Sequence, residues 1–337
     1  MRERERETGE TQLVATYSKQ WQEYKTEFLK TADELPTALV IEATDRCDYS
    51  KCPACYKACE QGKGVDLQLD QIKAWMEVLQ KNNNVPEQIW IAGGEPTLVP
   101  NLIEMINYLA NFGSEVCLVT NGFSLSNRDY AEKIVREANL AEVAITINGA
   151  NRDVHNLLMT ENENPFWNEV PEDIPLRDLL NGNLLGVTPM NNFDLSLEGL
   201  INMSQLKHEY GKDFRVAINL NMNHGADLED LVNLIESKGG RLNYAILQSL
   251  QAVGRAAPDQ PQNKSFAWQK PDKEMLTAYL EQGHQLMKSG RVDNVAIIDP
   301  VGEDLEKEMN LSEEPLYQPE PSPNIGPDGN LEANVVG

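Results

Sequence analysis

The sequence predicts an α/β fold, a partial TIM-type barrel of six βα units with a short N-terminal helical extension and a small C-terminal region. From Ala38 onward, short β-rich segments alternate with longer amphipathic stretches. Such alternation is typical of a parallel sheet with helices outside it. Because a closed barrel of this type needs eight strands, six units predict a barrel that stays partial.

Each expected strand is a short run rich in β-branched and apolar residues. These runs are Ala38–Ala43, Gln88–Ala92, Glu115–Thr120, Glu142–Asn148, Arg215–Asn221 and Leu242–Ser249. The expected helices have apolar residues at helical spacing. They are Leu69–Lys81, Leu102–Phe112, Asp129–Ala138, Ser196–Tyr210 and Leu228–Ser237, with a further helix near Lys273–Ser289.

The same pattern divides the chain into three regions. Residues 1–36 predict a charged helical extension with interspersed aromatic side chains, and residues 37–260 contain the barrel. An insertion at 160–193, rich in Asn, Glu and Pro, is typical of a lid or of a disordered segment. Residues 261–337 form the C-terminal region, which begins within a Pro/Gln-rich linker.

Charge and hydropathy narrow the classes of partner. The 337 residues carry a net charge of −24, from 53 acidic and 29 basic residues, which disfavours nucleic acids and anionic membrane surfaces. This charge suits a basic partner, although it more often only solvates a surface. No apolar run approaches the roughly 20 residues of a membrane helix, and residues 1–10 lack a secretory signal. We therefore expect a soluble, cytoplasmic protein.

Four of the five cysteines fall in one short segment, Cys47, Cys52, Cys55 and Cys59, here called the cysteine loop. In a reducing compartment such crowding predicts metal binding and not disulfides. Two sites fit: a [4Fe–4S] cluster on three thiolates, which leaves one iron open, or a structural zinc ion on all four. The placement of all four in one loop favours the cluster. Cys117 lies in an apolar strand and is expected to be a buried core thiol.

Polar residues follow the expected strands at their carboxyl ends, where ligands bind in parallel β/α folds. Two glycines at Gly93–Gly94 allow a close backbone approach, and Glu95, before Pro96, can accept a hydrogen bond from an ammonium group. The other polar residues at these ends could serve a ligand or simply a turn. They are Asn121, Asn148, Asn219 and Gln248.

Three segments together resemble the radical S-adenosylmethionine (SAM) superfamily over about residues 37–260: Leu39–Cys47, Gly93–Pro96 and Thr146–His155. The resemblance implies one [4Fe–4S] cluster on Cys47, Cys52 and Cys55. It implies that Gly93, Gly94, Glu95 and Pro96 hold the methionine end of SAM, with Glu95 at the amino group. It further implies contacts from Asn121, Asn148, Asn219 and Gln248, and reductive cleavage of SAM to a 5′-deoxyadenosyl radical that abstracts hydrogen.

The cysteine spacing departs from the usual pattern of the superfamily. Cys47, Cys52 and Cys55 give Cys-x4-Cys-x2-Cys, one residue longer than the usual Cys-x3-Cys-x2-Cys. Loops absorb one extra residue at little cost. Cys52, Cys55 and Cys59 are an alternative triplet, but Cys47 directly follows the strand, where the superfamily has its first ligand. We therefore prefer the triplet that begins at Cys47.

The substrate class also comes from resemblance. No cysteine follows Cys117, so a single cluster is expected, although Ile325–Asn330 resembles a turn found in relatives with auxiliary clusters. The chain resembles maturases of ribosomally made peptides, including Nif11-type spliceases that excise a tyrosine-derived fragment. The partners implied are a precursor peptide, a small leader-recognition protein and a flavodoxin- or ferredoxin-type electron donor. The alternatives are a radical SAM enzyme of a small molecule and a non-enzymatic zinc-binding interaction protein.

Overall fold

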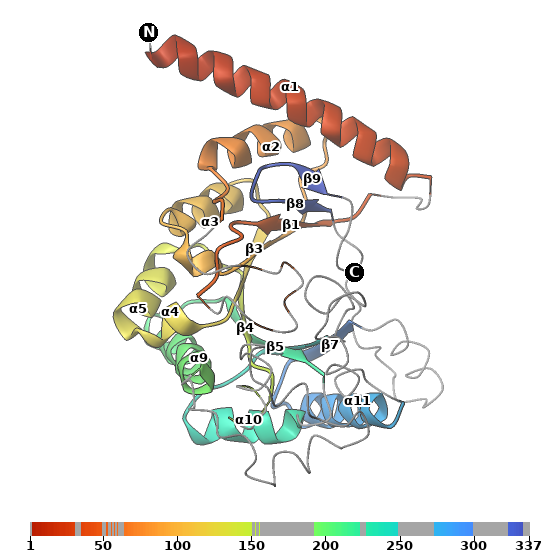
Figure 1. Cartoon of the computed structure of the whole chain (residues 1–337). Coiled ribbons are helices and arrows are strands. Elements are labelled where there is room, and N and C mark those ends of the chain that lie inside the picture. Colours follow the sequence, from red (N-terminus) through yellow and green to blue (C-terminus); the bar gives the residue numbers. More distant parts are fainter. Residues whose placement is uncertain are drawn as a thin grey trace, which may run out of the picture.

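The computed structural model shows one parallel sheet with helices arranged in an arc along its outer side (Figure 1). It describes residues 2–30, 35–48, 52, 55, 57, 59, 64–149, 152, 155, 192–222, 227–248, 273–298 and 323–332. The partial TIM-type barrel expected from the sequence is confirmed. The expected insertion at 160–193 lies outside the described residues, except for Asn192 and Phe193.

The described strands form one sheet in the order β7-β6-β5-β4-β3-β2-β1-β8-β9. Strands β1 to β8 pair in parallel, and β9 pairs antiparallel with β8. The bounds are β1 Ala38–Glu42, β2 Gln88–Ala92, β3 Glu115–Thr120, β4 Glu142–Thr146, β5 Arg215–Asn221, β6 Tyr244–Gln248, β7 Asn294–Ile298, β8 Asn324–Ile325 and β9 Leu331–Glu332.

Helices connect these strands, and two of them begin after a residue whose side chain caps the helix. Asn127 accepts hydrogen bonds from the backbone N–H groups of Asp129 and Tyr130, and Asp227 caps α10 by accepting from the N–H of Asp230. The bounds are α1 Arg2–Phe28, α2 Leu69–Lys81, η1 Pro96–Leu98, α3 Leu102–Ala110, α4 Phe123–Ser126, α5 Arg128–Glu137, α9 Asn192–Glu209, α10 Leu228–Ser237 and α11 Lys273–Lys288.

The two faces of the sheet bury different side chains, because successive residues of a strand point to opposite faces. Residues such as Leu39 and Ile41 of β1 join the main core between sheet and helices. The opposite face, here called the inner face, carries a second apolar cluster of Ala144, Ala217 and Ile246 with Trp90, Val119 and Tyr244 packed against it. Helices therefore cover one face, and the other is available to line a site.

The N-terminal helix packs against the C-terminal hairpin formed by β8 and β9. Tyr17 of α1 stacks on Trp75 of α2 with ring centroids 4.5 Å apart. The indole N–H of Trp75 donates to the carbonyl of Gly329 at 2.8 Å, and the side chain of Gln20 pairs with Asn330 and the N–H of Leu331. The hairpin thus covers the free edge of β1.

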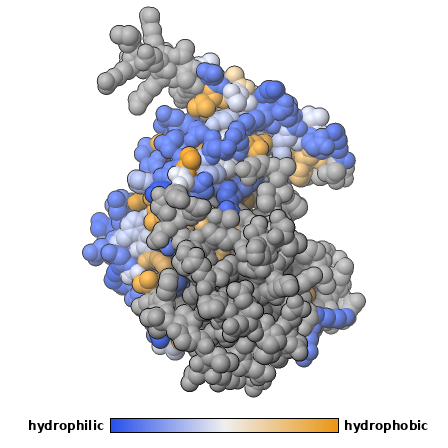
Figure 2. Space-filling model, viewed as in Figure 1, coloured by the Kyte–Doolittle hydropathy of each residue, from blue (hydrophilic) through white to orange (hydrophobic). Residues whose placement is uncertain are grey.

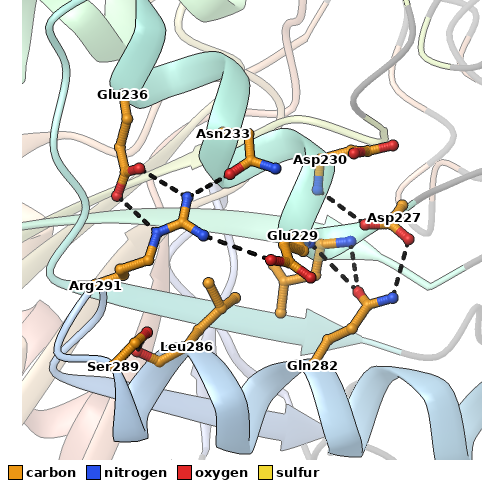
Figure 3. A network of polar contacts seen from close by, with 10 residues as sticks. Asp227, Glu229, Asp230, Asn233, Glu236, Gln282, Leu286, Ser289 and Arg291 are labelled. Atoms are coloured by element: carbon orange, nitrogen blue, oxygen red, sulfur yellow. Dashed lines mark hydrogen bonds and ion pairs between the residues drawn. The ribbon is translucent and has the colours of Figure 1, made fainter.

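At the other end of the sheet, a polar network joins α10 to α11 and to the turn before β7 (Figure 3). The guanidinium of Arg291 donates to both carboxylate oxygens of Glu236, at 3.1 and 2.7 Å, and to Asn233 at 2.7 Å. Gln282 of α11 accepts from the N–H of Leu228 and donates to Asp227 at the start of α10. This network fixes the last helix pair of the barrel.

One parallel strand was not expected from the sequence. Strand β7 continues the sheet beyond β6, with Tyr244 to Gln248 in register with Asn294 to Ile298. A five-residue apolar run does not reveal by itself whether it forms a strand. The helix expected near Lys273–Ser289 is present as α11. The barrel architecture therefore extends into the region that we expected to lie outside it.

On the face seen in Figure 2, the described residues are mostly hydrophilic, with small scattered hydrophobic patches. Among the helices that the structure describes, none combines the length and the apolar character that crossing a membrane requires. Both observations agree with the strongly acidic composition of the sequence.

Candidate functional site

The cysteine loop follows β1, and at least two of its thiols, those of Cys55 and Cys59, lie within hydrogen-bonding distance of each other. All five cysteines are described, and none forms a disulfide. The buried thiol of Cys59 shares a hydrogen bond with Cys55. This bond and burial raise the pKa of Cys59, with a smaller contribution from the charge of Cys47. Lys57 forms an ion pair with the buried carboxylate of Glu42 at the end of β1. The loop is therefore rich in thiols and is attached to the carboxyl end of β1.

The donor chemistry of this loop suits an iron–sulfur cluster. Thiolates are the protein ligands of such clusters, and Cys47, Cys52 and Cys55 are all partly accessible, whereas Cys59 is buried. Among the described residues, no three Cys, His, Asp or Glu side chains are placed to hold a single metal ion. The triplet of Cys47, Cys52 and Cys55 stays a prediction.

Residues 43–46 and 64–67, which precede and follow the cysteine loop, are here called its stem. The glycine pair after β2 lies directly against this stem. The N–H of Gly94 donates to the carbonyl of Thr44 at 2.5 Å, and the N–H of Glu95 donates to the carbonyl of Arg46 at 2.7 Å. A Cβ atom at Gly93 would overlap the carbonyl oxygen of Thr44, and one at Gly94 would overlap that of Arg46. Both positions therefore require glycine, and the backbone that they approach belongs to the protein itself.

Glu95 and Pro96 together begin the short helix η1. Pro96 occupies its first position, where a missing N–H costs nothing. Glu95 precedes it as the cap, and its Oε1 accepts from the N–H of Thr97 at 3.0 Å and from the hydroxyl of Thr97 at 2.6 Å. The turn after the glycine pair thus directs the carboxylate inward.

The carboxylate of Glu95 is almost completely buried. Its Oε1 also accepts from the hydroxyl of Thr120 at 2.6 Å, and Oε2 accepts from the N–H of Asn121 at 2.8 Å. Burial and the nearby charge of Asp48 raise the pKa of Glu95 to about 7, against the effect of these hydrogen bonds. Among the described groups that shift this pKa, none is a cation.

Asn121, at the end of β3, links that strand to the cysteine loop. Its side-chain N–H donates to the carboxylate of Asp48 at 2.6 Å, and its side-chain oxygen accepts from the N–H of Phe123 at 2.9 Å. Asp48 directly follows Cys47 in the chain, and its carboxylate lies 3.9 Å from the Cys47 sulfur. Asn121 therefore lies close to the expected cluster ligands.

Asn148, after β4, forms a second polar group together with β5. Its side-chain oxygen accepts from the side chain of Asn221 at 2.9 Å. Its backbone N–H donates to Nδ1 of His155 at 3.0 Å, and the fully buried ring of His155 packs edge-on against Phe193 at 5.6 Å. Burial lowers the pKa of His155 to about 3, so this imidazole is neutral and acts as an acceptor.

Asn219 and Gln248 lie on neighbouring strands. Asn219 pairs in register with Thr146 of β4, and Gln248 with Asn221 of β5. The side-chain oxygen of Asn219 is buried and has no hydrogen-bond partner among the described residues. Since buried polar atoms are normally paired, this oxygen is suited to accept a hydrogen bond from a ligand.

The inner face becomes less polar away from these strand ends. Ala217 lies two residues before Asn219 on the same face of β5 and belongs to the apolar inner cluster. At the opposite end of β5, Arg215 bridges Glu142 and Glu115, each at 2.8 Å. The inner face is therefore polar at the carboxyl ends of its strands, apolar in the middle and charged at the amino ends.

Several residues of this site were not singled out from the sequence. Thr97 and Thr120 both donate hydrogen bonds to Glu95. Asp48 accepts one from the side chain of Asn121, and His155 accepts one from the backbone N–H of Asn148. Thr120 ends an expected strand at the correct edge of the sheet, which is a usable signal. The contacts of Asp48 and His155 depend on tertiary structure and have no local signal.

Comparisons of the sequence with known proteins point to one superfamily. Residues 41–167 match the family model described as the Radical SAM superfamily. A 7,8-dihydro-6-hydroxymethylpterin dimethyltransferase of Methanocaldococcus jannaschii is 33% identical over 135 residues, which span 40% of this chain and 26% of that protein. A PqqA peptide cyclase of Rhodopseudomonas palustris is 30% identical over 118 residues, 34% of this chain and 30% of that protein.

Solved structures show the same fold. SuiB of Streptococcus suis bound to S-adenosylmethionine aligns with a TM-score of 0.58 at 15% identity, over 92% of this chain and 63% of that one. SuiB bound to the precursor peptide SuiA gives a TM-score of 0.57. The chain spans 63% of SuiB and at most about a third of these curated relatives. At this identity the likeness to SuiB concerns the fold alone.

Proposed function

Since residues 41–167 match the Radical SAM superfamily, whose cofactors are a [4Fe–4S] cluster and S-adenosylmethionine, we propose that the chain is a member that modifies a peptide by radical chemistry. Cys47, Cys52 and Cys55 would hold the cluster, and the buried carboxylate of Glu95 would take the amino group of SAM. The observation that carries this proposal is a buried carboxylate that lies against the stem of a thiol-rich loop, with no cation among the described groups that shift its pKa.

When bound, the cluster would supply an electron to SAM, and the two cofactors together would supply the radical chemistry. The residues of the protein would position the cofactors and shield the reaction from water. Thr97, Thr120 and the N–H of Asn121 hold the Glu95 carboxylate in one orientation, so that it stays ready for an ammonium group. Near the carboxyl end of β5, the side-chain oxygen of Asn219 has no hydrogen-bond partner among the described residues and could accept from a ligand. Asn148 and Gln248 lie near it. The apolar inner cluster below excludes water, which protects a radical from side reactions.

A peptide substrate is supported by the relatives. One curated relative is a PqqA peptide cyclase, and SuiB, which has this fold, is known in complex with a precursor peptide. We propose a ribosomal precursor peptide as substrate, a small separate protein that recognises its leader, and a flavodoxin- or ferredoxin-type electron donor. In its narrowest form, the proposal is a Nif11-type splicease that excises a tyrosine-derived fragment.

A second candidate, a radical SAM enzyme of a small molecule, is favoured by the pterin dimethyltransferase relative. The two candidates differ in where hydrogen is abstracted. Reconstituted protein should transfer deuterium to 5′-deoxyadenosine from a labelled peptide encoded beside its gene in the first case. In the second case deuterium should come from a labelled pterin. Transfer from the pterin and not from any such peptide would refute the peptide proposal.

The test of the radical mechanism compares two thiols. Protein purified and reconstituted without oxygen should bind iron and sulfide, and with dithionite and SAM it should release 5′-deoxyadenosine. Cys52→Ala should abolish both, whereas Cys117→Ala should retain them, because Cys117 is buried in β3 outside the loop. Zinc without iron or sulfide would favour the zinc-binding alternative, and equal 5′-deoxyadenosine from both variants would refute the assignment of the loop.

A further inference from the structure

Beyond the thiols themselves, the stem of the cysteine loop contains a charged pair that the radical chemistry does not use. We infer that Asp66 is a positioning residue that fixes the entry and exit of the cysteine loop, and so sets how tightly the loop retains an iron–sulfur cluster. This inference rests on the function proposed above. It assigns a role to residues 64–67, which follow the loop.

The carboxylate of Asp66 accepts hydrogen bonds from two residues that precede Cys47. Its Oδ1 accepts from the hydroxyl of Thr44 at 2.6 Å and from Nε of Arg46 at 2.8 Å, and its Oδ2 accepts from the terminal nitrogen of Arg46 at 2.6 Å. The pair is therefore bidentate, which fixes orientation as well as distance. Residues on the two sides of the loop are joined through one side chain.

Arg46 is also held from other directions. The same terminal nitrogen donates to the carbonyl of Leu98 at 3.1 Å, and the backbone N–H of Arg46 donates to the hydroxyl of Thr44 at 3.0 Å. Its carbonyl accepts from the N–H of Glu95 at 2.7 Å. The residue directly before the first expected ligand, Cys47, thus has its side chain, N–H and carbonyl all fixed, and Asp66 supplies two of these bonds.

Backbone contacts close the stem beside this pair. The N–H of Asp45 donates to the carbonyl of Val65 at 3.3 Å, and the N–H of Leu67 donates to that of Ala43 at 2.9 Å. The N–H of Val65 donates to the Asp45 carboxylate at 2.5 Å. Gly64 has a φ of +133°, and a Cβ atom there would overlap that carboxylate. The stem is therefore a closed, specific structure.

The electrostatics keep Asp66 ionised. Although burial raises its pKa, the hydrogen bonds from Arg46 and Thr44 outweigh that effect and hold the pKa of Asp66 below its ordinary value. The side chains of Arg46 and Asp66 are only 27% and 24% exposed, so water screens the pair less than a surface pair. The stem is thus closed by a charged pair at neutral pH.

A closed stem affects metal binding for a general reason. Ordering the ligands of a metal site opposes binding, and the groups around the ligands commonly change metal affinity by about 10- to 100-fold. Asp66 touches none of the cysteines in the contacts described. Its effect must therefore appear in cluster retention, through the placement of Cys47 and the rest of the loop.

The test uses two matched substitutions. Asp66→Asn removes the charge from a bidentate Arg–carboxylate pair at the stem, and Glu236→Gln does the same to the pair between α10 and Arg291 in the turn before β7 (Figure 3). Anaerobically reconstituted proteins are exposed to a chelator, and loss of the visible absorption of the cluster is followed. We expect Asp66→Asn to lose its cluster at least tenfold faster than wild type, and Glu236→Gln to lose it at the wild-type rate.

Two further readouts separate positioning from simple destabilisation. The melting temperature of the metal-free Asp66→Asn protein should fall no further than that of Glu236→Gln, and the electron paramagnetic resonance signal of its reduced cluster should change. A wild-type loss rate and signal would overturn the inference, and so would a larger fall in melting temperature. A wild-type protein that binds no iron would instead refute the proposed function, and the inference with it.

Discussion

The buried carboxyl group of Glu95 should give the metal-free protein a measurable pH dependence. Its pKa is about 7 in the folded protein, mainly because of burial, against an ordinary value of 4.5. Between these two values the unfolded chain releases a proton that the folded chain retains. The stabilisation is therefore complete below about pH 4.5 and is lost as the pH rises through about 7.

The size of the effect follows from this interval. At about 1.36 kcal/mol per pH unit, the range from 4.5 to about 7 corresponds to a loss of about 3 kcal/mol in the free energy of unfolding. Because Glu95 is 1% exposed, solvent screening does not reduce this value much. Glu95→Gln keeps the shape of the side chain and cannot titrate, so its stability should lack this component.

The assay is urea unfolding of metal-free wild type and Glu95→Gln at several values between pH 5 and pH 8. Wild type should lose roughly 2–3 kcal/mol relative to the variant across this range, slightly less than the full effect because part of the loss lies below pH 5. The titrations of Glu142 and His155 are common to both proteins and cancel in the comparison. The new amide faces hydrogen-bond donors, but that cost is constant with pH. A difference that does not vary with pH would refute the argument that burial raises the pKa of Glu95.

Three other substitutions test the site. Gly94→Ala should lower the free energy of unfolding by about 1–3 kcal/mol in urea, since its Cβ would overlap the carbonyl of Arg46 and break two backbone hydrogen bonds. Asn219→Val should leave metal-free stability equal or higher in the same assay, yet weaken SAM binding in calorimetry, because its oxygen is unpaired among the described residues. Relative to His155→Phe, wild type should lose stability as the pH falls from 6.5 towards 3, since burial keeps that imidazole neutral and the Glu95 contribution is common to both proteins. Unchanged stability for Gly94→Ala, unchanged SAM affinity, or an unchanged acid profile would contradict the respective prediction.

Much of the barrel could be predicted from the sequence because its strands and helices have strong local patterns. The bounds of Gln88–Ala92, Glu115–Thr120 and Leu69–Lys81 agree with the structure. Strand β7 and the two-residue strands β8 and β9 were not anticipated, since they become strands only by pairing with distant neighbours. Short apolar or polar segments carry too little pattern to reveal such pairing.

The candidate site was predictable in its location more than in its contacts. The sequence indicated that Gly93–Gly94 allow a close approach, but only the structure shows that they approach the stem of the cysteine loop. It indicated that Glu95 can accept from an ammonium group, but gave no sign that two threonines would hold it. The bridge between Asp66 and Arg46 joins residues on either side of the loop. Such contacts are set by tertiary structure, which local spacing does not encode.

The pairing of β8 with β1 has a consequence for biosynthesis. Strand β1 is made early, but the segment that covers its outer edge, Asn324–Ile325, follows after residues 43–323. At about 5–20 residues per second, their translation takes on the order of 15–60 s. During that time the nascent chain exposes an unpaired strand edge, which is a common starting point for aggregation. We expect the ribosome-bound chain to need a chaperone until the hairpin emerges.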